Sequence, residues 1–268
     1  MNRTPRCALS IAGSDPSGGA GMQADLKTFS ALGVFGMSVI TSVVAENTFH
    51  VIDSEDVRPD MIASQIDAVF EDIPPDAVKI GMLSCVDTMM IVSTKLKELE
   101  PKNVVVDPVM YAKNGAALMD PGSIDTLIAN IIPLADIITP NIPETEKIAG
   151  LDAGSIASVK DMEHAAKLIY DMGCKHVLVK GGHAIGDATD VLYDGNRFYY
   201  YSHTRINTKN THGTGCTLSS AIASYLALGD TMPEAVKGAK EYVSGAIDNA
   251  LELGCGCGPT NHFWNLGE

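Results

Sequence analysis

The stretch that decides the fold is Asn207-Thr208-Lys209-Asn210-Thr211-His212-Gly213-Thr214-Gly215-Cys216-Thr217, a turn that runs directly into an apolar helical pattern at 218–228. Gly213 and Gly215 let the backbone turn tightly and approach a ligand closely. A helix that begins here presents unpaired N–H groups and the positive end of its dipole, which predicts an anion site, usually for phosphate. Cys216 lies at the mouth of this site, where the helix terminus is expected to lower the pKa of the thiol. A loop around a buried structural cysteine is the alternative.

Outward from this stretch, strand patterns alternate with helix patterns along the chain. Strands are expected over 7–12, 37–45, 77–80, 103–107, 136–139 and 176–180, with a hairpin at 190–201. Helices are expected over 22–32, 60–70, 87–99, 121–131, 140–149, 158–172, 217–228 and 233–253. The alternation predicts an α/β fold with a mostly parallel central sheet and helices on both faces. No linker divides residues 1–268, so we expect a single domain.

Composition narrows the classes of function. The 268 residues are 46% apolar and 19% charged, with a formal net charge of −14, so a sizeable core is expected under an acidic surface. An acidic surface argues against nucleic-acid binding, which needs a basic footprint. No apolar run is long enough to span a bilayer and no signal peptide is visible, so we expect a cytoplasmic protein. The six cysteines are scattered as in reduced proteins, and Cys255-Gly-Cys257 with His262 offers too few ligands to favour a metal site.

Unusual polar residues follow several of the expected strands, and ligands of parallel sheets bind where the carboxyl ends of the strands meet. Asp107 and Glu144 follow two of these strands, and their oxygens suit Mg²⁺. Lys180 follows another, just before two glycines, where a point charge beside bare backbone suits a phosphate chain. A turn aspartate, a first-turn glutamate and a surface lysine are the structural alternatives. With the anion site, these residues make up a set for phosphoryl transfer.

Two other enzyme classes have weaker support in the sequence. The run Gly19-Ala-Gly21-Met-Gln-Ala24, with Glu46 at the end of the next strand, resembles a dinucleotide fingerprint, but it begins six residues after the glycine that ends the first strand. A covalent enzyme with Cys216 as nucleophile and His212 as base lacks a pattern for a third, orienting group. The P-loop motif is absent from the sequence.

Several long motifs resemble those of the hydroxymethylpyrimidine/phosphomethylpyrimidine kinases of thiamine biosynthesis. The similarity runs nearly end to end, on residues 12–29, 79–83, 106–110, 112–115, 139–144, 179–183, 207–217 and 258–263. It implies a ribokinase-like three-layer sandwich. It also implies ATP- and Mg²⁺-dependent phosphorylation of 4-amino-5-hydroxymethyl-2-methylpyrimidine (HMP), and then of HMP phosphate to the diphosphate. We expect small-molecule substrates and a homodimer.

The resemblance also assigns roles to individual residues. It implies that Cys216 is the active-site cysteine, at the position where most ribokinase-like enzymes have an aspartate base. The other implied sets are an anion hole at Gly213, Thr214 and Gly215, a pyrimidine pocket at Asp25, Glu46, Met82 and Val109, ATP contacts at Lys180, Thr208 and Lys240, and metal contacts at Asp107 and Glu144. By helical pattern alone, Lys240 would be a surface residue.

Two positions bear on the choice of substrate. Glu46 stands where such enzymes usually carry glutamine, whose amide both accepts from the 4-amino group and donates to a ring nitrogen, whereas an ionised glutamate only accepts. Either Glu46 or the aminopyrimidine is then protonated. Pyridoxal kinase is the alternative function. The Cys-Lys-Gly associated with cysteine-containing pyridoxal kinases is replaced here by Ala112-Lys113-Asn114-Gly115, which favours the pyrimidine kinase.

Overall fold

The computed structural model describes residues 5–112, 115–182 and 188–266, so the predicted motif residues Lys113, Asn114 and His183 lie outside the described part. Eight strands form the central sheet: β1 (Cys7–Ala12), β2 (Phe35–Ile40), β5 (Ala77–Ile80), β6 (Val104–Val106), β7 (Ile137–Ile138), β8 (Val177–Val179), β9 (Ala188–Tyr193) and β10 (Phe198–His203). Their order is β10-β9-β8-β7-β6-β5-β1-β2. In this order, neighbouring strands from β8 through β7, β6, β5 and β1 to β2 pair in parallel. The hairpin of β9 and β10 is antiparallel and joins the sheet at β8, also in antiparallel orientation.

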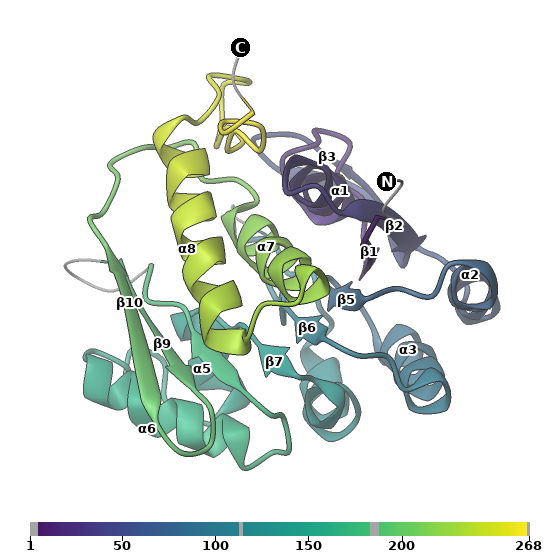
Figure 1. Cartoon of the computed structure of the whole chain (residues 1–268), viewed down its shortest axis with the longest axis horizontal. Helices are drawn as coiled ribbons and strands as arrows, with labels where there is room; N and C mark the ends of the chain where they lie inside the picture. Colours follow the sequence, from purple (N-terminus) through teal and green to yellow (C-terminus); the bar gives the residue numbers. More distant parts are fainter. Residues whose placement is uncertain (1–4, 113–114, 183–187, 267–268) are drawn as a thin grey trace.

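Helices cover both faces of the sheet, which confirms the predicted three-layer sandwich (Figure 1). One face carries α1 (Gly21–Ala31), α7 (Thr214–Leu228) and α8 (Met232–Asp248). The other face carries α2 (Pro59–Asp72), α3 (Val86–Leu99), α5 (Ile142–Ile148) and α6 (Val159–Tyr170). Each layer buries its own apolar cluster against the sheet, because the central strands are apolar on both sides.

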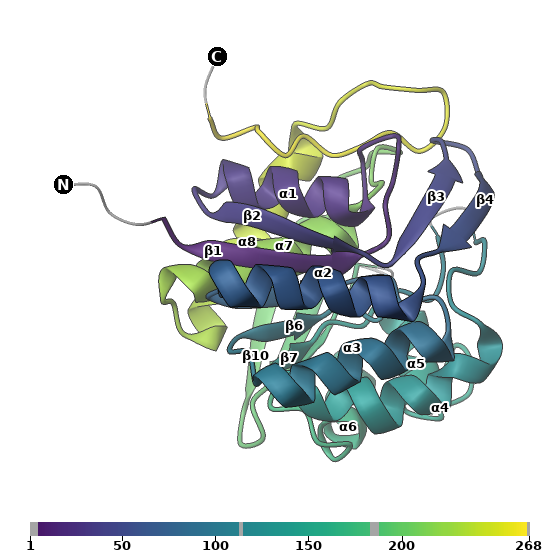
Figure 2. The ribbon, with the colours of Figure 1, turned by 90° about the vertical axis from the view of Figure 1, so that its right-hand side faces the viewer.

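The expected strand 37–45 is in fact two strands that belong to different sheets. β2 ends at Ile40, and β3 (Ser42–Glu46) pairs with β4 (Val51–Asp56) in a separate two-stranded sheet that projects beyond the main one (Figure 2). The division is made by distant contacts, since Ser42 O accepts from Ser14 N at 2.9 Å and Thr41 N donates to Ala12 O. β4 was missed in the sequence because five of its six residues are exposed, so it has no apolar period to detect.

Two expected helices have different forms. The expected helix 121–131 is an irregular run of short turns. A 3-10 turn at Pro121–Ser123 leads into α4 (Ile124–Thr126), then a π turn at Leu127–Ile131 and a second 3-10 turn at Ile132–Leu134. The last helix ends at Asp248 rather than 253, because the returning C-terminal segment binds its last turn through a hydrogen bond from Asn261 N to Ala246 O.

In the described part of the chain, no helix is both long and apolar enough to cross a membrane. All six cysteines are free thiols.

Candidate active site

A cavity of about 750 Å³ opens at the carboxyl edge of the sheet, where the sequence predicts the site. Twelve of the thirteen predicted site residues line it: Glu46, Met82, Asp107, Val109, Glu144, Lys180, Thr208, Gly213, Thr214, Gly215, Cys216 and Lys240. The exception is Asp25, which is fully buried behind the wall. The parallel sheet therefore brings together residues that are as much as 194 positions apart in the chain (46 to 240).

The glycine-rich turn forms the start of α7, which begins at Thr214, three residues before the expected start. Gly213 caps the helix with a left-handed φ of 78°. A Cβ at this position would lie only 1.8 Å from the carbonyl oxygen of Gly19, so no other residue fits without moving the loop. The N-terminus of α7 is thus held against the 13–21 loop and faces the cavity, which is the geometry of an anion cradle.

A buried ion pair lies beside this turn. Lys180 Nζ is 2.8 Å from Asp107 Oδ1, and Thr139 Oγ1 donates to the same oxygen at 3.3 Å. A Cβ on Gly215 would lie 3.3 Å from Asp107 Oδ2 and 3.4 Å from Lys180 Nζ, so the pair packs against bare helix backbone. Burial lowers the pKa of Lys180, but Asp107 and Glu144 more than offset this, and the pKa lies above its ordinary value. The ammonium therefore stays charged at neutral pH.

Glu144 stands at the third position of α5, where Asn141 provides a capping box. Asn141 N donates to Glu144 Oε2 at 2.8 Å, and Glu144 N donates to Asn141 Oδ1 at 3.0 Å. Burial raises the pKa of Glu144 to about 7, with Lys180 opposing and Asp107 adding to the rise. A buried carboxyl beside a second carboxylate is a group that a divalent cation would stabilise in its ionised form. Asp107 and Glu144 thus fit Mg²⁺, which prefers such oxygens.

Lys240 points from α8 into the cavity rather than to the surface. Its Nζ is 2.7 Å from Asp190 Oδ2 on β9, and both side chains are mostly buried. Asp190 also accepts from Gly181 N at 2.8 Å and so joins α8 to the glycine pair after β8. Asp190 was not singled out in the sequence, because a lone aspartate near a hairpin carries no pattern of its own.

The two-stranded sheet of β3 and β4 with its connecting turn, residues 42–56, is called the flap below. It brings Glu46 to a cluster with Asp15 and His212, whose ligand atoms all lie within 4.8 Å of one another. Asp15 already accepts from Ser17, Gly19 and Ala20, and its Oδ2 is 2.9 Å from His212 Nε2. These bonds hold the pKa of Asp15 below its usual range although burial opposes them. Asp15 thus serves as a hub between the 13–21 loop and His212, and most of these bonds are made to its Oδ2.

Burial raises the pKa of Glu46 to about 7, with Asp15 adding to the rise and His212 opposing it.

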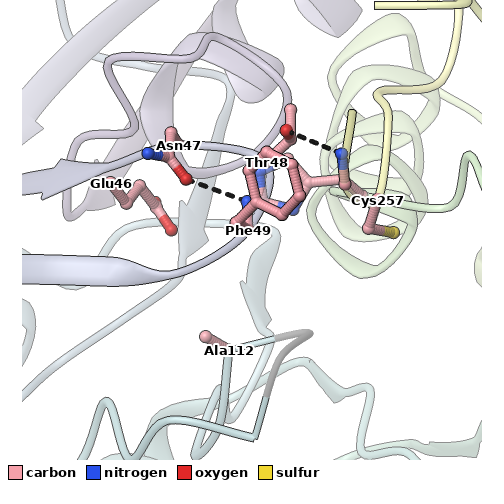
Figure 3. Close-up of a pocket in the computed structure, with 8 residues that line it drawn as sticks. Glu46, Asn47, Thr48, Phe49, Ala112 and Cys257 are labelled. Carbon is pink, nitrogen blue, oxygen red and sulfur yellow. Dashed lines mark hydrogen bonds between the residues drawn. The ribbon is translucent and has the colours of Figure 1, made fainter. Parts of the chain in front are cut away.

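A smaller pocket of about 230 Å³ adjoins the cavity beside Glu46, between the 47–50 turn and the C-terminal segment (Figure 3). Thr48 O accepts from Cys257 N at 2.9 Å, so the C-terminal segment holds the flap in place. Cys257 therefore contacts the flap, and His262 Nε2 lies 3.2 Å from Thr217 Oγ1.

The structure does not support the dinucleotide alternative. A Cβ on Gly19 would lie 2.5 Å from His212 Cδ2, and a Cβ on Gly21 would lie 2.7 Å from Gly13 O. These two glycines are needed for close packing within the loop, so their presence is explained without a bound pyrophosphate. The covalent alternative also loses support, since the His212 ring nitrogen faces Asp15 and no hydrogen bond joins it to Cys216 among the described residues.

The expected lowering of the Cys216 thiol pKa is wrong. Burial raises the pKa of Cys216 to about 11; Lys79 and the Gly21 N–H act to lower it, while Asp25 and Asp107 act to raise it. The partial burial of the thiol outweighs the groups that lower its pKa. Cys216 is therefore a neutral thiol at physiological pH, which suits hydrogen bonding to a substrate hydroxyl more than proton abstraction.

Comparison with known proteins decides the family. The family model described as phosphomethylpyrimidine kinase matches residues 15–261. The chain belongs to this family. It is 48% identical to the hydroxymethylpyrimidine/phosphomethylpyrimidine kinase of Bacillus subtilis, with 96% of this chain and 94% of that protein covered. It is 49% identical to the thiamine biosynthesis bifunctional protein ThiED of Geobacter sulfurreducens over 95% of this chain, and spans 52% of that longer protein.

Solved structures of kinases share the fold of this family member. Phosphomethylpyrimidine kinase from Clostridium difficile has a TM-score of 0.81 at 51% identity, covering 90% of this chain and 99% of that one. An ADP complex of Bacillus subtilis pyridoxal kinase has a TM-score of 0.89 at 39% identity, covering 97% and 98%. The expected ribokinase-like fold and kinase class are confirmed.

Proposed function

We propose that this phosphomethylpyrimidine kinase family member transfers the γ-phosphoryl group of ATP to HMP, and then to HMP phosphate. The observation that carries the proposal is the convergence of one anion cradle with two buried cations and a thiol. The start of α7, Lys180, Lys240 and Cys216 all line the same cavity. Such an arrangement can hold a phosphate chain and a hydroxyl in line, and phosphoryl transfer depends mainly on positioning and charge neutralisation.

The residues divide into two groups by their chemistry. Met82 and Val109 provide apolar walls, and Glu46 provides the polar partner for an aminopyrimidine ring. Lys180, Lys240 and Thr208 suit a polyphosphate. Cys216, between the groups, is placed to orient the hydroxymethyl oxygen by a hydrogen bond. The proton of that hydroxyl passes to the phosphoryl oxygens as the new P–O bond forms and the bond to the ADP leaving group breaks. Cys216, with a pKa of about 11, is protonated beforehand and cannot accept this proton.

We further propose Mg²⁺ as the cofactor, held by Asp107 and Glu144. Bound there, the ion would neutralise charge on the phosphates. The support is the pair of buried carboxyls described above, of which Glu144 has a raised pKa that a nearby cation would lower. Lys180, already bonded to Asp107, keeps that carboxylate in a fixed orientation.

The test of the function is ³¹P NMR of the protein with ATP, Mg²⁺ and either HMP or pyridoxal. We expect a monophosphate from HMP, followed by a diphosphate. If only pyridoxal is phosphorylated, the assignment of the phosphoryl-transfer site would stand. The substrate would then be a B6 vitamer and not the pyrimidine. Transfer to neither compound would contradict the proposal. The pyrimidine is favoured over pyridoxal because the family model and the more similar relatives, at 48% and 51% identity, are pyrimidine kinases.

Assembly and location are also proposals. We propose a homodimer in the cytoplasm, with residues 1–268 forming one domain. The support for a dimer is that the flap carries three apolar side chains that are each more than half exposed, Val43, Phe49 and Ile52. The support for one domain is the single eight-stranded sheet, which takes its strands from residues 7 to 203. Light scattering of the purified protein measures the assembly directly.

Replacing Cys216 by alanine is expected to lower kcat for HMP by about 10-fold to 100-fold, because the hydroxymethyl oxygen loses its orienting partner. Serine at 216 should restore part of the rate, since its hydroxyl also forms hydrogen bonds. Steady-state kinetics with HMP and with HMP phosphate make the measurement. Cys174, a buried thiol beneath α6, is the control site, and its alanine variant should keep kcat unchanged. Full activity of the Cys216→Ala protein on both steps would remove Cys216 from the mechanism.

Glu46 predicts a pH dependence of substrate binding. Below pH 7 its protonated carboxyl can both donate to and accept from the neutral aminopyrimidine ring, as an amide does; above its pKa of about 7 it can only accept. We therefore expect KM for HMP to rise as pH increases through 7, by about 10-fold per unit at most. In Glu46→Gln the rise should disappear, because the amide does not titrate. An identical pH profile in both proteins would show that Glu46 does not contact the ring.

A further inference from the structure

Asp190 on β9 joins two segments that each carry a lysine of the cavity. Its Oδ2 accepts from Lys240 Nζ at 2.7 Å, and its Oδ1 accepts from Gly181 N at 2.8 Å. Only 3% of Asp190 is exposed, and the side chain of Lys240 is mostly buried as well. Gly181 directly follows Lys180 in the chain. One carboxylate thus connects α8 with the turn that carries Lys180.

The backbone beside Lys180 is fixed on both sides. Lys180 N donates to Pro140 O at 2.8 Å, and the next N–H along the chain, that of Gly181, donates to Asp190. A Cβ on Gly181 would lie only 1.8 Å from Thr189 O, so a glycine is needed for the chain to pass this close to β9. The turn that carries Lys180 is therefore held at a set position along β9.

The apolar face of α8 packs the helix on the sheet without help from the ion pair. The side chains that it buries share an apolar cluster with Leu192 of β9, and they are Ala235, Val236, Ala239, Tyr242 and Val243. A buried ion pair can usually be replaced by apolar side chains of similar size with little loss of stability. Asp190 and Lys240 line the ligand cavity, so their charges are better explained by what the cavity binds.

We propose that Asp190 is a positioning residue for phosphoryl transfer: its carboxylate fixes the Lys240 ammonium relative to the turn that carries Lys180. This role rests on the proposed kinase function, in which both lysines meet the phosphates of ATP. An ammonium has three N–H donors, and Asp190 takes one of them in a fixed direction. A lysine side chain that is already ordered loses less conformational entropy when it binds phosphate.

The test is a double-mutant cycle of Asp190→Asn and Lys240→Met, measured by steady-state kinetics at varied ATP concentration. Asparagine can still accept from Gly181 N, but it has no charge to hold Lys240. We expect kcat of Asp190→Asn to fall about 10-fold, because the ammonium is no longer aimed at the transferred group. KM for ATP should stay the same or fall, because a negative charge has left the wall of the cavity.

The other members of the cycle show whether Asp190 acts through Lys240. Lys240→Met should lower kcat by about 10-fold as well and should raise KM for ATP. The double variant should keep the kcat of Lys240→Met to within about threefold, because Asp190 then has no ammonium to hold. Where Asp190→Asn does not fold, this comparison decides by itself, since the double variant buries no unpaired charge.

Three results would overturn the proposal. They are a kcat of Asp190→Asn within about threefold of the native value, a raised KM for ATP in that variant, and a further loss beyond about threefold in the double variant. Asp194 provides a matched control on the same hairpin, where it accepts from Asn196 N and Arg197 N and does not line the cavity. Asp194→Asn should lower the thermal stability and leave kcat unchanged.

The cycle is measured with HMP or, if the native protein phosphorylates only pyridoxal, with pyridoxal. The role of Asp190 is thereby tested separately from the choice of substrate. A native protein that phosphorylates neither compound contradicts the proposed function, and this role with it. An active native protein whose variants give any of the three contrary results contradicts the role of Asp190 alone.

Discussion

Replacing Gly213 by alanine is expected to abolish most of the kinase activity, with kcat reduced by about 100-fold or more. The new Cβ would lie 1.8 Å from Gly19 O, and the left-handed φ of 78° disfavours any side chain. The turn must therefore move, and the first-turn N–H groups of α7 lose the positions in which they would bind phosphate. Strain at such a position also lowers the free energy of unfolding by about 1–3 kcal/mol. Steady-state kinetics and thermal unfolding measure the two effects.

Gly229 provides the matched control at the other end of the same helix. It also has a left-handed φ, of 106°, but its Cβ would meet no atom within 4 Å. Gly229→Ala should therefore show a comparable loss of stability with nearly native kcat. Equal losses of activity in the two variants would mean that Gly213 matters only for folding, and would contradict its place in an anion cradle.

The Lys180→Met variant is expected to lose about 100-fold in kcat/KM for ATP, because the ammonium that packs against the α7 turn no longer helps to neutralise the transferred phosphoryl group. The substitution also leaves Asp107 buried and unpaired, which costs roughly 3–5 kcal/mol of stability. Removal of the same charge raises the pKa of Glu144 further, since Lys180 contributes most among the groups that lower it. KM for HMP should change little. Kinetics at varied ATP concentration separate these parameters.

Two further variants separate charge from folding. Lys180→Met combined with Asp107→Asn removes both members of the pair, so stability should recover while activity does not. Lys175→Met breaks an ion pair with Asp136 in which the lysine side chain is 73% exposed, and it should leave kcat/KM unchanged. Recovery of activity in the double variant would show that Lys180 serves only to neutralise Asp107.

The sheet and its carboxyl-edge site could be predicted because they depend on local patterns. The buried strands β1, β5 and β8 are short apolar runs, and each is followed by glycine or by a polar residue that a parallel sheet places at one edge. Glycines at 213 and 215 before an apolar helix signalled the phosphate cradle. Twelve of the thirteen predicted site residues line the cavity, although several of them, Lys240 included, were predicted from the family resemblance and not from local patterns.

Predictions failed where the deciding contact came from elsewhere in the chain. Val51–Asp56 has no strand pattern of its own and forms β4 only because β3 offers it a backbone to pair with. The Cys216 thiol was expected to be acidic from its place on α7, but burial among β5, α1 and the loop after β6 raises its pKa instead. Lys240 faces the cavity because Asp190, 50 residues away, pairs with it.

The sequence by itself determined the order of the elements, the edge of the sheet that carries the site, and the residue types gathered there, because backbone preference and apolar period act over a few neighbouring residues. The tertiary structure alone decided the charge states and the pairings: the neutral thiol of Cys216, the raised pKa of Glu46, and the buried pair of Lys79 with Asp25. The physical reason is that desolvation and Coulomb interaction depend on distances through space, and these are fixed only when segments far apart in the chain have packed together.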